Sequence, residues 1–183
     1  MDSIGLVESS SIAVGYEIED AMLKAADVRL VLARTICSGK YLVVVGGSVA
    51  DTRAAVQAGQ AAAREGLVDA RHIPNVHPGV FPAISCAVEL DPAQARSLGV
   101  IETFSASAVI ESADAAAKAA DVTLFRIHLA MAIGGKGFCL FSGDVAAVEA
   151  AAQAGARVAS EAGVLVATAV IPGPRRELFA EYI

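Results

Sequence analysis

Hydrophobic and polar positions in the first half of the chain predict short strands alternating with amphipathic helices. The strand segments are rich in Val, Ile and Leu and are bounded by Gly, Ser or Pro. The helical segments repeat apolar residues every three to four positions, so that charged residues lie on another face. The predicted elements are, in order, a strand at 3–10, a helix at 16–28, strands at 28–36 and 40–47, a helix at 48–66 and a strand at 67–74.

Local signals fix several ends of these elements. Ser48 is a suitable N-cap for the second helix, and Gly66 follows its end. Pro74 stops the fourth strand, because proline cannot donate to a sheet ladder. A tight turn at Ser38 and Gly39 joins the second and third strands into a hairpin.

The second half of the chain repeats the first. "DAMLKAADVRL" at 20–30 returns as "DAAAKAADVTL" at 114–124, and "GSVADTRAAVQAG" at 47–59 returns as "GDVAAVEAAAQAG" at 143–155. The offset between the copies grows in two steps, which marks two insertions, and the first lies between Leu124 and Gly143. Two copies are too few for a solenoid, so the repeat indicates a duplicated domain.

Each copy has the element order βαββαβ, which is typical of a ferredoxin-like unit with two helices on one face of an antiparallel sheet. The sequence therefore predicts an α+β protein of two tandem ferredoxin-like domains, at residues 1–94 and 95–183. The connection at 75–97 is rich in proline and predicts an irregular segment with one short helix. Residues 174–183 predict a C-terminal helix with Pro174 in its first turn.

Composition and charge argue against several classes of protein. The 183 residues are 55% hydrophobic, yet no uncharged apolar stretch reaches the length of a membrane span, and the N-terminus has no signal-peptide pattern. The net charge of −6, without a Lys/Arg run, argues against nucleic acid as a partner, and we expect no membrane partner either. Three scattered cysteines indicate free thiols in a reducing cytosol rather than a disulfide framework.

The sequence contains few candidate catalytic groups. His72, His77 and His128 form no metal-ligand or triad spacing, and the sequence contains no nucleophile elbow, so we expect no catalytic residue and no enzyme. The "IGGKG" stretch at 133–137 lies between two strands and lacks a Ser/Thr after the lysine, which argues against a phosphate loop. Its glycines and the single glycine of "CSGK" at 37–40, Gly39, suit hairpin turns with positive φ and close approach of backbones, including across a symmetry axis.

Several of these segments together resemble a known family. "DAMLKAADV", "VVVGGSVADTRAAVQAG", "GDVAAVEAAAQAG" and "VIPGPRREL" are similar to bacterial microcompartment shell proteins. More narrowly, "RTICSGK", "NVHPGVFPAIS" and "MAIGGKG" resemble the tandem-domain, trimer-forming type found in propanediol-utilisation compartments. The resemblance covers essentially the whole chain, and it implies that both halves are microcompartment shell domains.

The resemblance implies a homotrimer in which three chains form a pseudohexameric disc. Such discs tile with other shell proteins around enzymes in a cytoplasmic microcompartment, and the hairpins ring a central pore for small polar metabolites. The residues it assigns to the pore are Ser38, Gly39 and Lys40 of the first hairpin and Gly134, Gly135, Lys136 and Gly137 of the second. It assigns Lys24 and Lys118 to contacts between neighbouring discs.

The chain departs from the family pattern at two places, the site of an iron–sulfur cluster and the edge of the disc. Members that hold an iron–sulfur cluster place a cysteine directly after "GGK", where this chain has Gly137. Cys37 is the remaining candidate metal ligand, one per chain, whereas a [4Fe–4S] centre usually has four thiolates, so we expect no resident cofactor. At the edge, Gly173 and Asn75 replace an arginine, for which Arg175, Arg176 or His77 would compensate.

The leading hypothesis is a structural shell protein whose pore also gates metabolite traffic. An alternative is a shell protein that carries electrons through a pore-bound iron–sulfur cluster. Another is a small-molecule-binding regulatory protein, since duplicated ferredoxin-like domains often bind ligands at subunit interfaces.

Overall fold

The computed structural model describes residues 1–91 and 95–179, and its elements follow the predicted order twice. The first copy comprises β1 (Ser3–Ser9), α1 (Ile12–Ala25), β2 (Arg29–Ile36), β3 (Lys40–Gly47), α2 (Val49–Ala63) and β4 (Leu67–Pro74). The second comprises β5 (Ser97–Thr103), α4 (Ala106–Ala119), β6 (Val122–Leu129), β7 (Gly137–Gly143), α5 (Val145–Glu161) and β8 (Leu165–Pro172). The shorter elements are α3 (Val80–Ile84) and the 3-10 turns η1 (Cys37–Gly39), η2 (Arg64–Gly66) and η3 (Arg176–Phe179).

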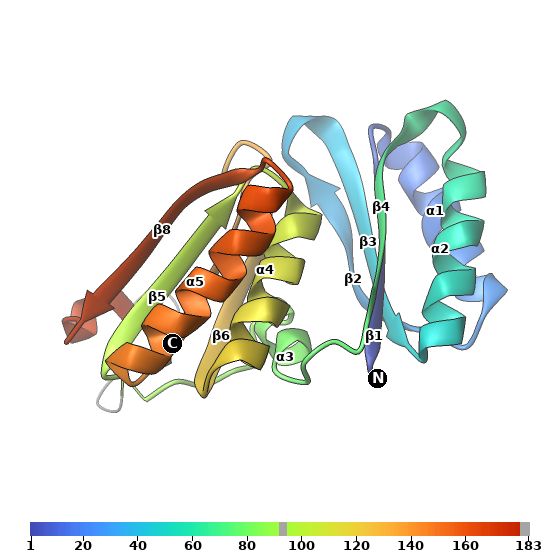
Figure 1. Ribbon diagram of the computed structural model, residues 1–183. Coiled ribbons are helices and arrows are strands. Elements are labelled where there is room, and N and C mark those ends of the chain that lie inside the picture. The colour runs from blue at the N-terminus through green and yellow to red at the C-terminus, as the bar shows by residue number, and fades with distance from the viewer. Residues whose placement is uncertain (92–94, 180–183) are drawn as a thin grey trace. The chain divides into compact units, whose positions relative to one another are not determined.

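Each copy forms one four-stranded antiparallel sheet. The strand orders are β2-β3-β1-β4 and β6-β7-β5-β8, which is the same order in the two copies. In Figure 1, α1 and α2 lie side by side on one face of the first sheet, and α4 and α5 do so on the second. The prediction of an α+β chain with two tandem βαββαβ domains is therefore confirmed.

The chain divides into two compact units. One contains Met1–Pro78 together with Met131–Gly134, and the other contains the described residues of Gly79–Ala130 and Gly135–Ile183. The predicted short helix of the connection is α3, and it belongs to the second unit although it precedes the expected boundary at residue 94. Of the predicted C-terminal helix, the described part is the 3-10 turn η3, and residues 180–183 lie outside the described residues.

Serine side chains set the start of three of the helices. The predicted cap is confirmed at Ser48, whose Oγ accepts a hydrogen bond from the Asp51 amide at 3.1 Å. The first helix begins earlier than its apolar pattern predicts, at Ile12 rather than residue 16, because Ser11 accepts from the Val14 amide. Ser105 caps α4 in the same way.

Glycines in the second helix of each copy bring the helix pair together. A Cβ on Gly59 would lie 2.8 Å from Met22 Cγ, and one on Gly155 would lie 2.6 Å from the Ser112 carbonyl oxygen. Real Cβ atoms essentially never come so close, so these positions exclude any larger residue without a shift. The repeated "QAG" is thus a packing requirement of the α1–α2 and α4–α5 contacts.

The connection and the C-terminal turn cover part of the second sheet. Strand β5 alternates, so that Ile101 faces α5 and Leu98 faces the opposite side. Leu98 packs there with Phe179 of η3, and Val88 and Leu90 of the connection pack against the same cluster.

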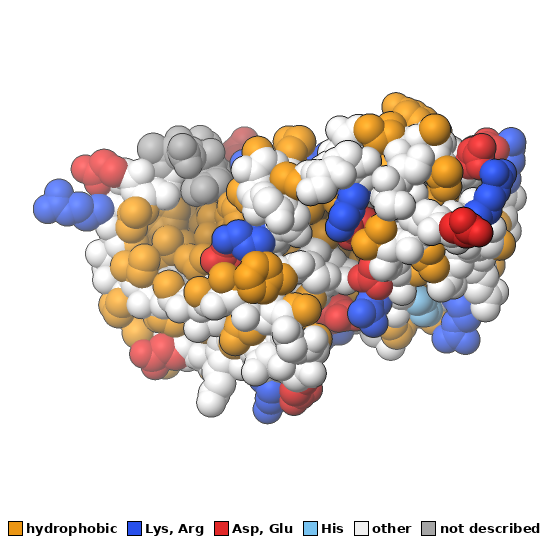
Figure 2. Space-filling view, turned by 90° about the horizontal axis from the view of Figure 1, so that it is seen from above, with side chains coloured by type: hydrophobic (Ala, Val, Ile, Leu, Met, Phe, Trp, Pro, Cys, Tyr) orange, Lys and Arg blue, Asp and Glu red, His pale blue; other side chains and the backbone are white. Residues whose placement is uncertain are grey.

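Charged side chains on the face seen in Figure 2 are scattered among uncharged ones, with Lys and Arg in no single patch.

Candidate pore hairpins and assembly edge

The first candidate hairpin is a three-residue turn between β2 and β3. Ser38 and Gly39 have φ angles of 64° and 71°, the left-handed region that glycine adopts most easily. A Cβ on Gly39 would meet nothing within 4 Å in this chain. Gly39 is therefore required by backbone conformation, and the space beside it is open.

The second hairpin is longer, because it contains the first of the two predicted insertions. It comprises residues 130–135 and is closed at its base by a hydrogen bond from the Ala130 amide to the carbonyl of the next residue, Lys136, at 3.0 Å. Gly134 and Gly135 have φ angles of 67° and 82°, again with open space where a Cβ would stand. Ala130 and Ala132 also have positive φ, which is uncommon for a residue with a side chain.

The lysine that follows each hairpin is paired with a glutamate of the neighbouring strand. Lys40 Nζ donates to Glu8 Oε1 at 2.7 Å, and Lys136 Nζ donates to Glu102 Oε1. These glutamates were not among the predicted site residues. The signal that could have found them is that both copies have a glutamate near the end of the first strand and a lysine at the start of the third strand or directly before it.

Gly137 is buried inside the second unit rather than exposed on the hairpin. A Cβ there would lie 2.6 Å from Val109 Cγ1 of α4. The first copy has the opposite arrangement, because Gly15 of α1 faces Tyr41 of β3, where a Cβ would lie 2.4 Å from Tyr41 Cβ. A small residue on the helix matches a large one on the strand in one copy, and the reverse holds in the other. The assignment of Gly137 to the pore remains a prediction.

The three thiols lie in different environments. Cys139 is fully buried in β7, and burial raises the pKa of its thiol to about 12. Cys86 is exposed, and Cys37 is half-buried in the first hairpin. Among the described residues no group of three or more His, Cys, Asp or Glu side chains could hold a metal ion. A Cβ at Gly137 would lie 2.6 Å from Val109 Cγ1, so this position is occupied by the packing of β7 against α4.

The histidines do not converge on one site. His72 Nε2 lies 3.1 Å from both the Val49 carbonyl oxygen and Thr52 Oγ1, and 3.2 Å from Ser3 Oγ. This polar network ties β1, α2 and β4 together. The His128 ring stacks on Phe138 with ring centroids 5.1 Å apart.

The two candidate edge lysines are held by an aspartate one helical turn earlier. Lys24 Nζ contacts Asp20 Oδ2 at 2.6 Å, and Lys118 Nζ contacts Asp114 Oδ2 at the same distance. The pairs differ in exposure, since the Lys24 side chain is 75% exposed and that of Lys118 is 44% exposed. Two similar segments, at 20–30 and 114–124, thus present their lysines differently.

The residues that replace the edge arginine share an unusual backbone conformation. Asn75 and Gly173 each follow the proline that ends an edge strand, and their φ angles are 54° and 56°. Asparagine and glycine adopt this left-handed region at the lowest cost, so the structure gives a local reason for both residues.

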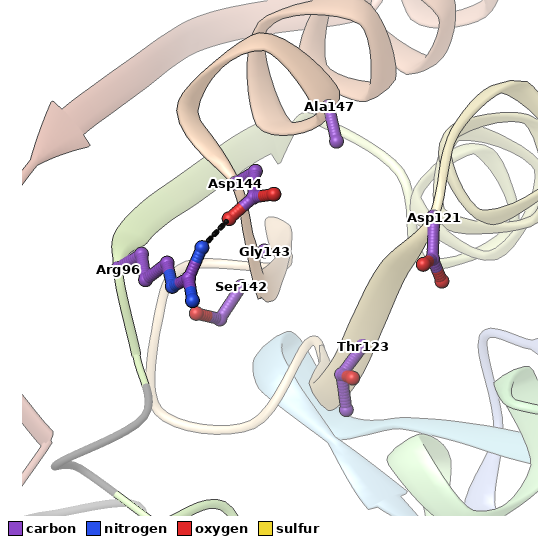
Figure 3. Close-up of a pocket in the computed structure, with 7 residues that line it drawn as sticks. All are labelled: Arg96, Asp121, Thr123, Ser142, Gly143, Asp144 and Ala147. Atoms are coloured by element: carbon purple, nitrogen blue, oxygen red, sulfur yellow. Dashed lines mark hydrogen bonds and ion pairs between the residues drawn. The ribbon is translucent and has the colours of Figure 1, made fainter.

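A polar recess of about 360 Å³ lies at the start of α5. Figure 3 shows Arg96 reaching Asp144 on one wall, with Asp121 and Thr123 on the other. The Arg96–Asp144 ion pair measures 2.8 Å, so the guanidinium is already matched by a carboxylate. The recess therefore presents no uncompensated charge from this pair to a ligand.

The structure is a duplicated βαββαβ chain with glycine-containing hairpins at matching places, and the comparisons with known proteins identify its family. The BMC domain model matches residues 3–76 and 97–174, so the chain belongs to the BMC-domain family and is a structural shell protein of a bacterial microcompartment. None of the described helices is long and apolar enough to cross a bilayer.

Relatives cover both the whole chain and its halves. The bacterial microcompartment shell protein PduT of Citrobacter freundii is 42% identical over 99% of this chain and 97% of its own length. The crystal structure of a microcompartment protein from Desulfitobacterium hafniense superposes with a TM-score of 0.94 at 48% identity, covering 98% of this chain and 99% of the other. The shell protein EutM of Escherichia coli is 46% identical over 45% of this chain and 84% of its own length.

Proposed function

We propose that the chain assembles as a homotrimer, in which three copies of two domains form a pseudohexameric disc of the shell facet around a central pore. The observation that carries the proposal is the tandem duplication itself. Both units have the same strand order, and EutM matches about half of the chain while PduT matches all of it. Three chains would supply the six domains that close a ring, and closed cyclic symmetry is the usual form of a homo-oligomer.

The pore of this disc is proposed to be lined by the two hairpins. They occupy the same place in each unit, between the second and third strands, and their glycines have open space beside them. Backbones can therefore approach one another closely at an axis and present N–H groups to a passing solute. Because the hairpins differ in length, the pore has threefold rather than sixfold symmetry.

Small polar metabolites are the proposed solutes, and the protein itself is proposed not to catalyse their conversion. A ring of backbone N–H groups favours polar or anionic solutes over large apolar ones. The curated relatives named above are shell proteins, and His72 and His128 lie in separate environments.

The edge of the disc is proposed to contain Lys24 and Lys118. Both lie in the last turn of the first helix of their unit, and the aspartate one turn earlier restrains each side chain. A lysine at the same place in every copy can meet the same surface of a neighbouring disc, or of another shell protein, repeatedly across a facet.

Assembly state tests the proposal directly. Light scattering coupled to size exclusion should give three times the chain mass of 18.6 kDa, and electron microscopy at higher concentration should show flat sheets or tubes. A stable monomer or dimer that never forms sheets would contradict the trimeric disc. It would favour the alternative of a ligand-binding regulatory protein.

No resident cofactor is proposed for the pore. A trimer would bring three Cys37 thiols to the axis, and Cys139 cannot add a fourth because it is fully buried in β7 of the second unit. The chain therefore does not supply the four thiolates of a usual [4Fe–4S] centre. Iron and sulfide analysis after anaerobic purification tests this expectation. Stoichiometric iron in the wild type that is lost in Cys37→Ser would overturn it.

A further inference from the structure

We propose that Glu8 and Glu102 set the ion selectivity of the pore by neutralising the lysine that follows each hairpin. The inference rests on the proposed function, because it requires the hairpins to surround the path of the solute. It adds a role for two residues of the first strands, which are positioning and charge-compensating groups rather than part of the hairpins themselves.

The two ion pairs have the same construction. Glu8 lies opposite Leu42 in the β1–β3 ladder, and Glu102 lies opposite Phe138 in the β5–β7 ladder. In each sheet the lysine is two positions before that partner, so glutamate and lysine share one sheet face as diagonal neighbours. The register of the sheet, rather than a flexible contact, therefore brings the charges together.

The pairing is independent of the hairpin that precedes it. The first hairpin is the three-residue turn η1, whereas the second is the longer segment after Ala130. Lengthening the hairpin changes its tip but leaves the lysine at its base within reach of the glutamate. Both copies therefore have a lysine at the base of the hairpin whose positive charge is paired with a glutamate.

Burial fixes the negative partner more firmly than the positive one in the first pair, whereas Lys136 and Glu102 of the second pair are about equally exposed, at 34% and 30%. The Glu8 side chain is 9% exposed, while that of Lys40 is 33% exposed. An ammonium group beside a narrow pore raises the local concentration of anions, because low-dielectric walls focus its field. A carboxylate in contact with it cancels this field at the distance of a passing ion. The wild-type pore is then selective through backbone N–H groups and size, with little preference from side-chain charge.

An ion pair with only a structural role would have the same geometry, so the test must measure the effect of the carboxylate charge on ion permeation. Glu8→Gln/Glu102→Gln keeps side-chain size and removes the carboxylate charge. Asp69→Asn/Asp144→Asn is the matched control, because it makes the same change in net charge at two arginine–carboxylate pairs, with Arg71 and Arg96, that lie outside the hairpins and the proposed edge. Purified trimers are inserted into a planar lipid bilayer under a KCl gradient, and the reversal potential is measured.

We expect the Glu variant to raise the chloride-to-potassium permeability ratio by at least about threefold, and the Asp control to leave it at the wild-type value. An unchanged ratio in the Glu variant, or an equal shift in both variants, would overturn the proposal. Wild-type trimers without conductance would overturn it as well. Sheet formation is scored on the same preparations, so that failure of the disc is distinguished from failure of the selectivity role. Should the double variant not fold, Glu102→Gln alone replaces it, because its side chain is 30% exposed.

Discussion

The contact between Gly137 and Val109 makes a quantitative prediction about the second unit. In Gly137→Ala the new methyl carbon would stand 2.6 Å from Val109 Cγ1 and 3.1 Å from Val109 Cβ. Val109 is fully buried, so it cannot move aside freely. Overpacking of this kind costs about 1–3 kcal/mol, partly offset by the ~0.5–1 kcal/mol by which alanine is favoured over glycine in a strand.

The double variant separates the contact from the two single effects. Val109→Ala alone removes two buried methyl groups and should destabilise by about 2 kcal/mol. In Gly137→Ala/Val109→Ala the new methyl group occupies space that the valine has vacated. We therefore expect the two free-energy changes to sum to more than the measured double effect, with a coupling energy of about 1–2 kcal/mol.

Urea unfolding followed by circular dichroism at one fixed protein concentration measures these differences, because the stability of an oligomer depends on protomer concentration. The two units need not unfold together, so the transition of the second unit is fitted separately. Gly163→Ala is the control in the same unit, since its φ of 71° is costly for alanine but no atom lies within 4 Å of the added Cβ. Additivity of Gly137→Ala and Val109→Ala within about 0.5 kcal/mol would refute the packing explanation of this glycine.

Three further outcomes follow from the structure. Because burial raises the pKa of the Cys139 thiol to about 12, this thiol loses its proton at lower pH in the unfolded chain than in the folded one. The free energy of unfolding should therefore fall above about pH 9, and more steeply in the wild type than in Cys139→Ala. Denaturant unfolding at a series of pH values measures the difference. Lys24→Ala and Lys118→Ala should leave trimers intact but weaken sheet formation in electron micrographs, and unchanged sheets would disprove their edge role. Gly173→Ala should cost about 1 kcal/mol through its positive φ alone, since a Cβ there meets nothing within 4 Å; a neutral thermal shift would count against this.

The architecture could be predicted from the sequence because its signals are local. Apolar periodicity distinguishes α1 and α2 from the strands, Pro74 and Pro172 end the fourth strand of each copy, and Ser48 begins a helix as predicted. Each signal acts within a few residues and needs no knowledge of the partner segment. The start of α1 was missed by four residues because the Ser11 cap, not the apolar stripe, decides where that helix begins.

The site could be predicted only in part. The hairpins were found from their glycines, and the structure confirms positive φ at Gly39, Gly134 and Gly135. The reason for Gly137 was not visible, because it depends on Val109 in the preceding helix. The hairpin residues and edge lysines remain predicted for the assembled disc.

The sequence by itself determined that one domain is written twice, that each copy is βαββαβ and that catalytic groups are scarce, since repeats, periodicity and composition are properties of the linear chain. The tertiary structure alone decided which residues meet. Sheet register joins Glu8 to Lys40, and helix–sheet packing opposes Val109 to Gly137. These partners are far apart in sequence, and only the closed core brings their atoms within contact distance, where packing and Coulomb forces act.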